Sequence, residues 1–171
     1  SYSNFRALDE SRIAYGLGAL KNMGSKSAMA IANYREENGD YDTVFDVCCI
    51  DSNAINRKCM ESLIQAGAFD SLAGHRSQHF AAIDQALNWG QKYNEESASA
   101  QENLFGGDNT ASALAPPILP DIIEWSKEES LRREKGTLGF YLSGNPLEKY
   151  MDDLLEFSNL DLMHIPEKKP K

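Results

Sequence analysis

The stretch LKNMGSKSA, residues 20–28, combines residue types that suit a site for a negatively charged group. Asn22 and Gly24 flank Met23, and both tolerate the backbone conformations that a tight hairpin between two helices requires. Met23 is expected to pin this hairpin to the core. The main-chain amides of Met23 to Ser27 would then point outward at the start of a helix, where an oxyanion binds well.

Two lysines beside this hairpin strengthen the prediction of a phosphate site. Lys21 precedes the turn, and Lys26 lies in the first turn of the following helix, together with Ser25 and Ser27. Such contacts hold a nucleic-acid backbone without reading its sequence, and they weaken as the salt concentration rises. An ordinary pair of helices joined by a glycine-capped turn is the alternative interpretation of this pattern taken alone.

A looser copy of the pattern occurs in LIQAGAFDSLAGHR, residues 63–76. Gly67 would begin the second hairpin, and Arg76 would lie near the start of the next helix, where it could contact the same backbone. For this copy the competing interpretation, a capped helix followed by a turn, is the stronger one.

A second motif, QENLF at residues 101–105, places two adjacent apolar residues in an otherwise polar stretch. Leu104 and Phe105 can insert into a preformed pocket of a partner protein while the side chain of Gln101 hydrogen-bonds in a neighbouring slot. The alternative is that the two apolar side chains attach this stretch to the surface of the same domain, and composition alone favours that alternative.

Residues that would carry catalysis or hold a metal are sparse in this sequence. Asp152 and Asp153 are the only adjacent aspartates, and neighbours on a helix point apart, so we expect a solvated face. His75 and His79 have a spacing that can serve a metal, but a pair without a third ligand is more often structural. We therefore expect no catalytic residue, metal or cofactor in this chain.

Composition is typical of a globular protein from a reducing compartment. The 171 residues have a net charge of −9 and are 42% hydrophobic, which suits one domain with an appendage. The spacing of Cys48, Cys49 and Cys59 fits neither a disulfide framework nor zinc. Without an apolar span or a secretory signal, we expect a cytoplasmic protein with no membrane partner. The acidic total argues against long-range attraction to nucleic acid.

Hydrophobic periodicity predicts a mostly α-helical chain with a small N-terminal β-hairpin at residues 4–15. Two helices are expected to flank the first hairpin, the second of them ending at Gly39. Further helices are predicted at residues 54–66, 75–93, 126–142 and 146–157.

These signals divide the chain into four parts. We predict a tandem helix-hairpin-helix domain at residues 1–93 and a long linker loop at residues 94–121, followed by C-terminal helices at residues 122–157 that pack on the domain. Residues 158–171 are predicted to be a boundary segment that leads toward a following domain. The absence of an initiator Met and the basic end EKKPK suggest a piece of a longer protein.

Three blocks of this sequence resemble one known family. They are IAYGLGALKNMGSKSAMAIANYRE, NRKCMESLIQAGAFDSLAGHRSQ and EWSKEESLRREKGTLGFYLSGNPLEKY, and in this order they are similar to the alpha subunits of bacterial DNA polymerase III, the C-family replicative polymerases. The resemblance runs from about Phe5 to Tyr150. It implies that the helix-hairpin-helix elements contact duplex DNA leaving the active site. It also implies that QENLF, found where the family keeps Gln-x-x-Leu-Phe, binds the β sliding clamp.

The resemblance also implies a division of work with parts outside this chain. Catalytic aspartates and their Mg²⁺ would belong to a palm domain, and an OB-fold domain would follow, so other replicase domains and subunits are expected partners. The two motifs would hold the polymerase on DNA for processive replication. Asn22 stands where the family usually has Gly, and Asn145 where it usually has His. The alternatives are a DNA-binding module of a repair nuclease or its accessory subunit, and a purely structural helical spacer.

Overall fold

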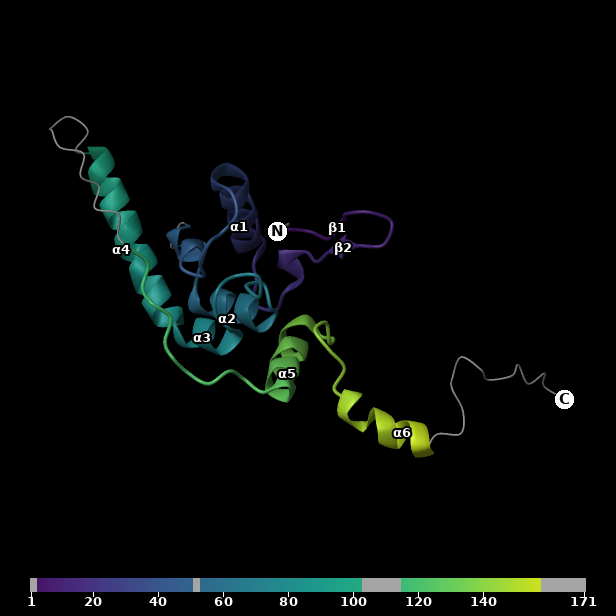
Figure 1. Cartoon of the computed structure of the whole chain (residues 1–171). Coiled ribbons are helices and arrows are strands. Elements are labelled where there is room, and N and C mark those ends of the chain that lie inside the picture. The colour runs from purple at the N-terminus through teal and green to yellow at the C-terminus, as the bar shows by residue number, and fades with distance from the viewer. Residues whose placement is uncertain (1–2, 51–52, 103–114, 158–171) are drawn as a thin grey trace.

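The computed structural model describes residues 3–50, 53–102 and 115–157. Most of them are helical, and one small two-stranded sheet precedes the helices (Figure 1), which confirms the predicted fold class. The α-helices are α1 (Ser25–Asn38), α2 (Arg57–Gln65), α3 (Arg76–Ala81), α4 (Ile83–Glu102), α5 (Lys127–Leu138) and α6 (Met151–Phe157). Three short 3₁₀ helices are η1 (Leu17–Ala19), η2 (Asp46–Cys49) and η3 (Glu148–Tyr150).

The N-terminal β-hairpin joins β1 (Arg6–Ala7) to β2 (Ile13–Ala14) as an antiparallel pair. Asp9 closes its turn, because one carboxylate oxygen accepts hydrogen bonds from the amides of Ser11 at 2.9 Å and Arg12 at 2.8 Å. The bond from the Ser11 amide, followed by that from the Arg12 side chain, lowers the pKa of Asp9. The predicted hairpin is therefore confirmed.

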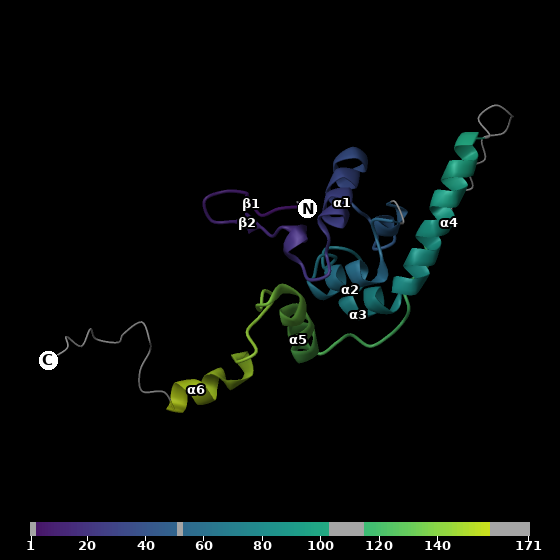
Figure 2. The ribbon, with the colours of Figure 1, turned by 180° about the vertical axis from the view of Figure 1, so that it is seen from behind.

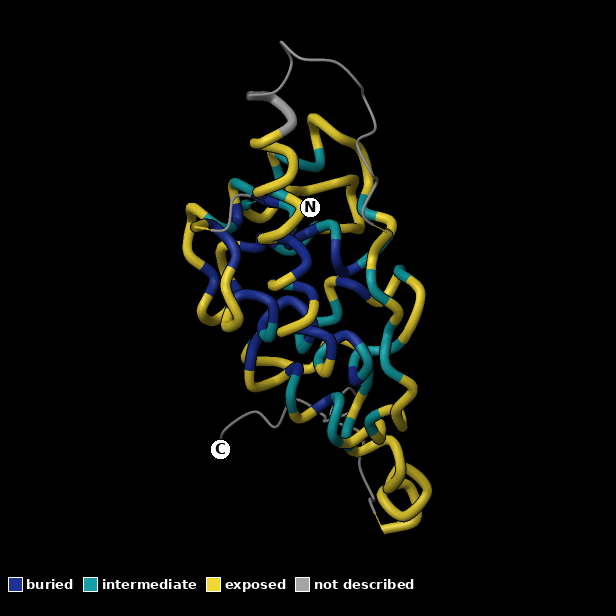
Figure 3. Tube along the Cα trace, turned by 90° about the vertical axis from the view of Figure 1, so that its left-hand side faces the viewer, coloured by how far each residue is buried: buried dark blue, intermediate teal, exposed yellow. Residues whose placement is uncertain are grey.

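The hydrophobic core lies where α1, η2, α2 and the first half of α4 meet, and Figure 3 shows the buried residues gathered in the middle of the molecule. α2 is its centre, because Met60, Leu63 and Ile64 are each at most 2% exposed. α4 comes close to η2 because Gly90 has no side chain: a Cβ at this position would overlap the carbonyl group of Cys48. The glycine therefore fixes the distance between these two elements.

Capping residues set two helix boundaries differently from the prediction. α2 begins at Arg57 instead of residue 54, because the side chain of Asn56 accepts a 3.0 Å hydrogen bond from the amide of Cys59. α5 ends at Leu138 instead of residue 142, because Gly139 adopts a left-handed conformation with φ +88° and its amide bonds to the carbonyl of Lys135. At its start, Ser126 caps α5 through the amide of Glu129, as predicted.

The predicted single helix over residues 75–93 is wrong at two points. The chain divides into α3 and α4 at Ala82, and α4 continues to Glu102, well past Tyr93. The extension is physically reasonable, because Glu, Ala and Gln favour helices and no glycine or proline occurs between Gly90 and Gly106. The polar composition after Tyr93 predicts that the helix ends there, and this prediction is wrong. The division of the chain into parts at residue 94 stays a prediction.

Two further helices are shorter than predicted. The helix expected before the first hairpin is only the 3₁₀ turn η1. The last helix was expected from Pro146, but η3 comes first and α6 starts at Met151. Asn145 does accept a 2.9 Å hydrogen bond from the amide of Leu147, so its side chain organises the turn that precedes η3.

Residues 115–126, here called the return segment, lead back from the α4 side of the molecule to α5, as both ribbon views show (Figures 1 and 2). The segment is extended but not loose. Gln78 donates a 2.9 Å hydrogen bond to the carbonyl of Pro120, and Ser77 donates one of 3.0 Å to that of Ile123. Trp125 packs edge-on against Phe80. α3 therefore holds the second half of the return segment, residues 120–125.

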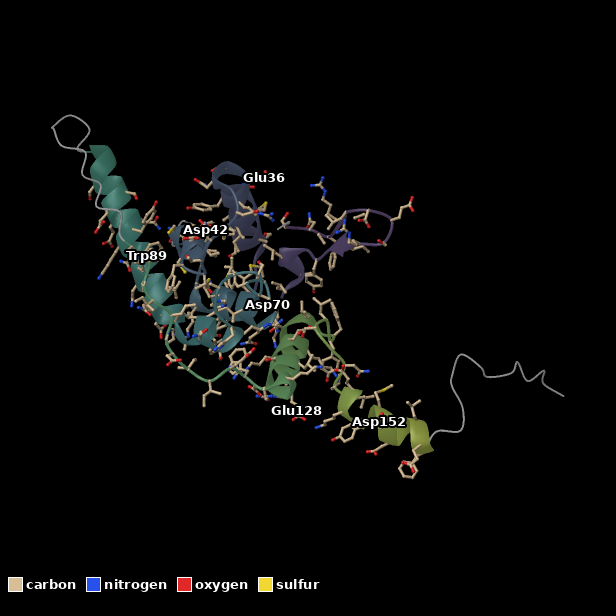
Figure 4. The ribbon with its side chains drawn as sticks, viewed as in Figure 1. Glu36, Asp42, Asp70, Trp89, Glu128 and Asp152 are labelled. Carbon is tan, nitrogen blue, oxygen red and sulfur yellow. The ribbon has the colours of Figure 1, made fainter. Side chains whose placement is uncertain are left out.

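The two C-terminal helices differ in packing. α5 contacts α2 and buries Leu131, Glu134 and Thr137. All of α6 is exposed, and Figure 4 shows Asp152 on this helix, away from the core. Packing of both helices on the domain was predicted, and in the structure it is α5 that supplies it.

Candidate nucleic-acid interface

The first hairpin has the predicted left-handed residue at Asn22, but the prediction for Gly24 is wrong. Gly24 has φ −76°, and a Cβ added there would meet no atom within 4 Å, so its backbone does not require a glycine. Asn22 has φ +62°, and no other non-glycine residue in the described part of the chain has a positive φ. Asparagine tolerates this left-handed conformation better than most residues, which explains how it replaces glycine here. Met23 is 7% exposed, and its sulfur lies 3.5 Å from that of Cys59 on α2. Burial raises the pKa of Cys59 to about 11, so the thiol under the hairpin stays neutral.

The main-chain amides at the start of α1 are the strongest feature of the site. Gly24 is the N-cap and contributes no side-chain hydrogen bond to the helix. Within the described residues, nothing accepts a hydrogen bond from the amides of Ser25, Lys26 or Ser27. The expectation of a free amide at Met23 is wrong, because that amide bonds to the carbonyl of Leu20 at 3.1 Å. Three donors therefore remain at the positive end of the helix dipole.

Charges around these amides favour an anion. Lys21 and Lys26 are exposed, and neither forms an ion pair with a described residue. The first turn of α1 contains no acidic residue. The hydroxyl of Ser27 donates to the carbonyl of Ala54 and ties α1 to the loop before α2. Ser27 therefore offers its amide to a ligand while its side chain fixes the helix.

The second hairpin is built differently from the first. Gly67 has φ +77°, and the amide of Ala68 bonds to the carbonyl of Leu63 at 2.9 Å, which closes the end of α2. His75 and Gln78 then form a reciprocal capping box at the start of α3. At the start of α3, side chains therefore accept hydrogen bonds from the amides of His75 and Gln78. At the start of α1, Gly24 has no side chain that could do the same.

Arg76 is committed to contacts within the chain. Its side chain is 13% exposed, and its guanidinium bonds to both carboxylate oxygens of Asp70, one of them at 2.8 Å. It also reaches the carbonyl of Gln65 at 3.3 Å and the carboxylate of Glu134 at 3.4 Å. The hydrogen bond to Asp70 is the main cause that raises the pKa of Arg76. DNA binding by Gly67 and Arg76 stays a prediction, and the structure gives Arg76 the role of joining α2, α3 and α5.

Glu134 is a structural residue that the sequence did not reveal. Its side chain is fully buried in α5 and accepts hydrogen bonds from the amides of Leu142 and Ser143, the latter at 2.8 Å, and from the Ser143 hydroxyl. With Arg76 it holds α5 and the turn after it on the helix-hairpin-helix unit. A glutamate in a run of charged residues looks exposed, and only the fold shows that this one is enclosed.

The QENLF motif begins at the end of α4. Gln101 belongs to the last turn of this helix, whereas Leu104 and Phe105 lie outside the described residues. From Glu95 to Ser99 the helix is exposed, and its far end points away from the core in both ribbon views (Figures 1 and 2). Just before this exposed stretch, the side chain of Asn94 donates a 3.4 Å hydrogen bond to the carbonyl of Ile50.

The two histidines have structural positions. His75 caps α3 with its Nδ1, and the buried His79 hydrogen-bonds to the carbonyl of Ala73 at 2.9 Å. Among the described residues, no three His, Cys, Asp or Glu side chains gather as metal ligands would. No helix in these same ranges is long and apolar enough to cross a bilayer.

Comparison with known proteins identifies relatives of this chain. A family model described as a helix-hairpin-helix motif matches residues 1–79. The protein named DNA polymerase III subunit alpha from Vibrio cholerae is 32% identical over 159 residues, which cover 92% of this chain. Proteins of the same name from Neisseria meningitidis and Borreliella burgdorferi are each 34% identical over 90% and 95% of the chain, respectively.

These matches occupy a small part of each relative. The aligned region covers 14% of the Vibrio cholerae protein, 13% of the Neisseria meningitidis protein and 14% of the Borreliella burgdorferi protein. The chain therefore corresponds to one segment of proteins that are several times longer.

Proposed function

Over most of its length the chain is a homologue of one segment of the bacterial DNA polymerase III alpha subunits, and on this premise we propose that it tethers a replicative polymerase to its template. In this proposal the start of α1 holds phosphates of duplex DNA, and QENLF binds the β sliding clamp that encircles the same duplex. Two weak contacts with one DNA–clamp assembly reinforce each other through effective concentration, which favours processive synthesis.

The observation that carries DNA binding is a set of three amides beside two lysines, none of which has a partner in the described part of the chain. The amides of Ser25 to Ser27 would hold a phosphate oxygen, with Lys21 and Lys26 adding charge. These groups contact only the backbone, so affinity would not depend on base sequence. Because the chain carries net charge −9, we expect weak binding that is measurable at low salt.

Clamp binding rests on the motif and on the element that precedes it. Burying Leu104 and Phe105 in a pocket would contribute roughly 1.5–3 kcal/mol each, and ordering the surrounding chain takes back part of this. An isolated peptide would thus bind with a dissociation constant on the order of micromolar. The exposure of Glu95 to Ser99 supports the proposal, because this part of α4 leads away from the domain's own core toward the start of the motif.

Catalysis is assigned to parts of the parent protein beyond this chain. Nucleotidyl transfer needs carboxylates that hold two metal ions close together, and in the described residues no such group exists. Asp152 and Asp153 lie on the exposed α6. In this proposal Mg²⁺ belongs to the parent polymerase, as does the DNA polymerase activity.

The clamp contact is tested by calorimetric titration of purified β sliding clamp with the chain and with a Leu104→Ala/Phe105→Ala variant. We expect saturable micromolar binding that the double substitution abolishes, while duplex binding stays unchanged. Ile118→Ala/Ile123→Ala is the matched control, because these two apolar residues are 89% and 92% exposed on the return segment. Equal loss in both variants, or no binding at high micromolar concentration, would rule out the motif as the contact.

The DNA contact is tested by the anisotropy of a fluorescent duplex titrated with Lys21→Ala/Lys26→Ala. Affinity should fall to the same extent for unrelated sequences, and the dependence of log K on log salt should lose a slope of about 1.8, since each phosphate contact contributes about 0.9. Lys92→Ala/Lys149→Ala removes the same charge from exposed positions on α4 and η3. A loss that varies with DNA sequence, or that the control reproduces, contradicts the assignment.

A further inference from the structure

A polar cleft of about 360 Å³ lies beside the hairpin, between α2 and α5. Lys21 and Asn22 of the hairpin form one wall, Gln65 of α2 lies in the second, and Arg132 and Gly136 of α5 lie in the third. Sequence patterns did not indicate this cleft, because its walls come from three separate parts of the chain. None of the roles assigned above to the α1 amides uses it.

Hydrogen bonds between the walls hold the cleft in shape. The amide of Lys21 donates to the carbonyl of Thr137 at 3.3 Å, which joins the hairpin to the last turn of α5. The Thr137 hydroxyl lies 3.1 Å from the amide oxygen of Gln65, which joins α5 to α2. Thr137 is 7% exposed, so these bonds lie mostly beneath the surface. The donors around the cleft are therefore presented by a fixed frame.

Hydrogen-bond donors predominate among the unused groups of this frame. In the described part of the chain, no partner is found for the ammonium of Lys21, the side-chain amide of Asn22 or the Nε2 of Gln65. Arg132 uses its Nε and Nη2 on Glu129, so its Nη1 is not engaged there. One acidic residue, Glu61, also lines the cleft, and its carboxylate already accepts a 2.9 Å bond from Arg57. Such a donor set fits an oxyanion.

We propose that this cleft binds a second phosphate of the DNA backbone, adjoining the phosphate held at the start of α1. Lys21 takes part in both positions, because it precedes the hairpin and lines the cleft. The duplex track thus continues from α1 across the hairpin to α5, and Arg132 becomes a DNA contact. This inference rests on the proposed DNA-binding function and extends it to an element that follows the QENLF motif in the sequence.

Gly136 allows a direct test of the proposed phosphate site, because it lines the cleft and has no side chain of its own. The residue is exposed within α5, and a Cβ added there would meet no atom within 4 Å. A side chain can therefore begin at this position without displacing a neighbour, and Glu and Gln are of nearly equal size and differ in charge. Gly136→Gln is the uncharged reference, so the difference between it and Gly136→Glu in binding a fluorescent duplex isolates the added charge. Gly136→Glu should weaken binding at low salt and reduce the salt slope by about 0.9, the contribution of one phosphate contact.

Two further variants separate this inference from the proposed function. Arg132→Gln should reproduce the loss of slope seen in Gly136→Glu, whereas Lys26→Ala affects the α1 position alone. If Lys26→Ala weakens binding while Gly136→Glu equals Gly136→Gln, the cleft is overturned and the α1 site stands. If Gly136→Glu acts and Lys26→Ala does not, the cleft stands and the α1 site is overturned. If the chain binds no duplex in low salt, both are overturned.

Inorganic phosphate distinguishes a DNA contact from a general anion site. Side-chain amide signals of Gln65 should shift in NMR spectra when a short duplex is added, and should not shift with inorganic phosphate at the same concentration of phosphate groups. Equal shifts with both additions would identify a general anion site and overturn the assignment to the DNA backbone. Absence of a shift with the duplex would overturn it as well.

Discussion

The first hairpin leads into the proposed phosphate site, and the outer half of α4 leads into the proposed clamp-binding motif. These two regions differ in their packing against the core. The hairpin is short, but Leu20 and Met23 on it are at most 7% exposed and anchor it to the core. The outer half of α4 is long, yet from Glu95 to Ser99 it is exposed throughout. Figure 4 shows Trp89 on the inner half of this helix, where it packs edge-on against Phe45.

The difference agrees with the chemistry of each proposed contact. Main-chain amides bind a phosphate only when the backbone is held in one conformation, so a site of that kind needs anchors in the core. A peptide that inserts apolar side chains into a partner must keep them out of its own core, so it gains from a position beyond the packed part of a helix. Packing against the core would therefore favour the phosphate contact, whereas it would keep the apolar side chains of the clamp-binding motif from reaching a partner.

The largest predicted effect on stability comes from a substitution that disrupts the anchor of the hairpin. Met23→Asp places a charge beneath the hairpin, at a buried position that contacts the uncharged thiol of Cys59. We expect a loss of roughly 3–5 kcal/mol in the free energy of unfolding, as for an unpaired buried charge. Ala98→Asp on the exposed half of α4 is the matched control and should change it by less than about 0.5 kcal/mol. Urea denaturation followed by circular dichroism measures both, and similar losses would show that the two regions are not packed differently.

An intermediate effect tests where α4 stops packing. Gly90→Ala introduces a Cβ that overlaps the carbonyl group of Cys48. The expected cost is about 1–3 kcal/mol as η2 and α4 move apart, although alanine is the better helix former. Ser97→Ala on the same helix should instead stabilise the chain by a few tenths of a kcal/mol. Thermal unfolding of the two variants gives the comparison, and a stabilising Gly90→Ala would contradict the close approach.

The smallest predicted effect on stability tests whether the left-handed backbone conformation of Asn22 has an energetic cost. Asn22→Gly should raise the free energy of unfolding by about 0.5 kcal/mol, because φ +62° costs glycine nothing. Asn22→Ala should lower it by about 1 kcal/mol, since alanine pays for the left-handed conformation without the local hydrogen bonding of asparagine. The opposite order in urea denaturation would mean that the Asn22 side chain has a stabilising contact of its own.

Patterns local in sequence predicted much of the fold, including the anchoring of the first hairpin. The N-terminal hairpin, the start of α1 after Gly24, the cap at Ser126 and the plug at Met23 follow from a few neighbouring residues each, and the structure confirms them. Helix ends were predicted less well. α4 continues through a polar stretch, and α5 stops at Gly139, because competing local preferences of similar size decide such boundaries.

By itself the sequence determined the helix-hairpin-helix unit, its lysines and the QENLF motif, since each depends on residues within one or two turns of each other. The tertiary structure alone decided the contacts between distant segments. It committed Arg76 to Asp70 and Glu134 and placed Arg132 beside Lys21 in one cleft. The physical reason is that burial and hydrogen-bond pairing depend on which segments meet in space. The sequence shows that a residue is an arginine or a glutamate, but it does not show whether the side chain is buried or exposed.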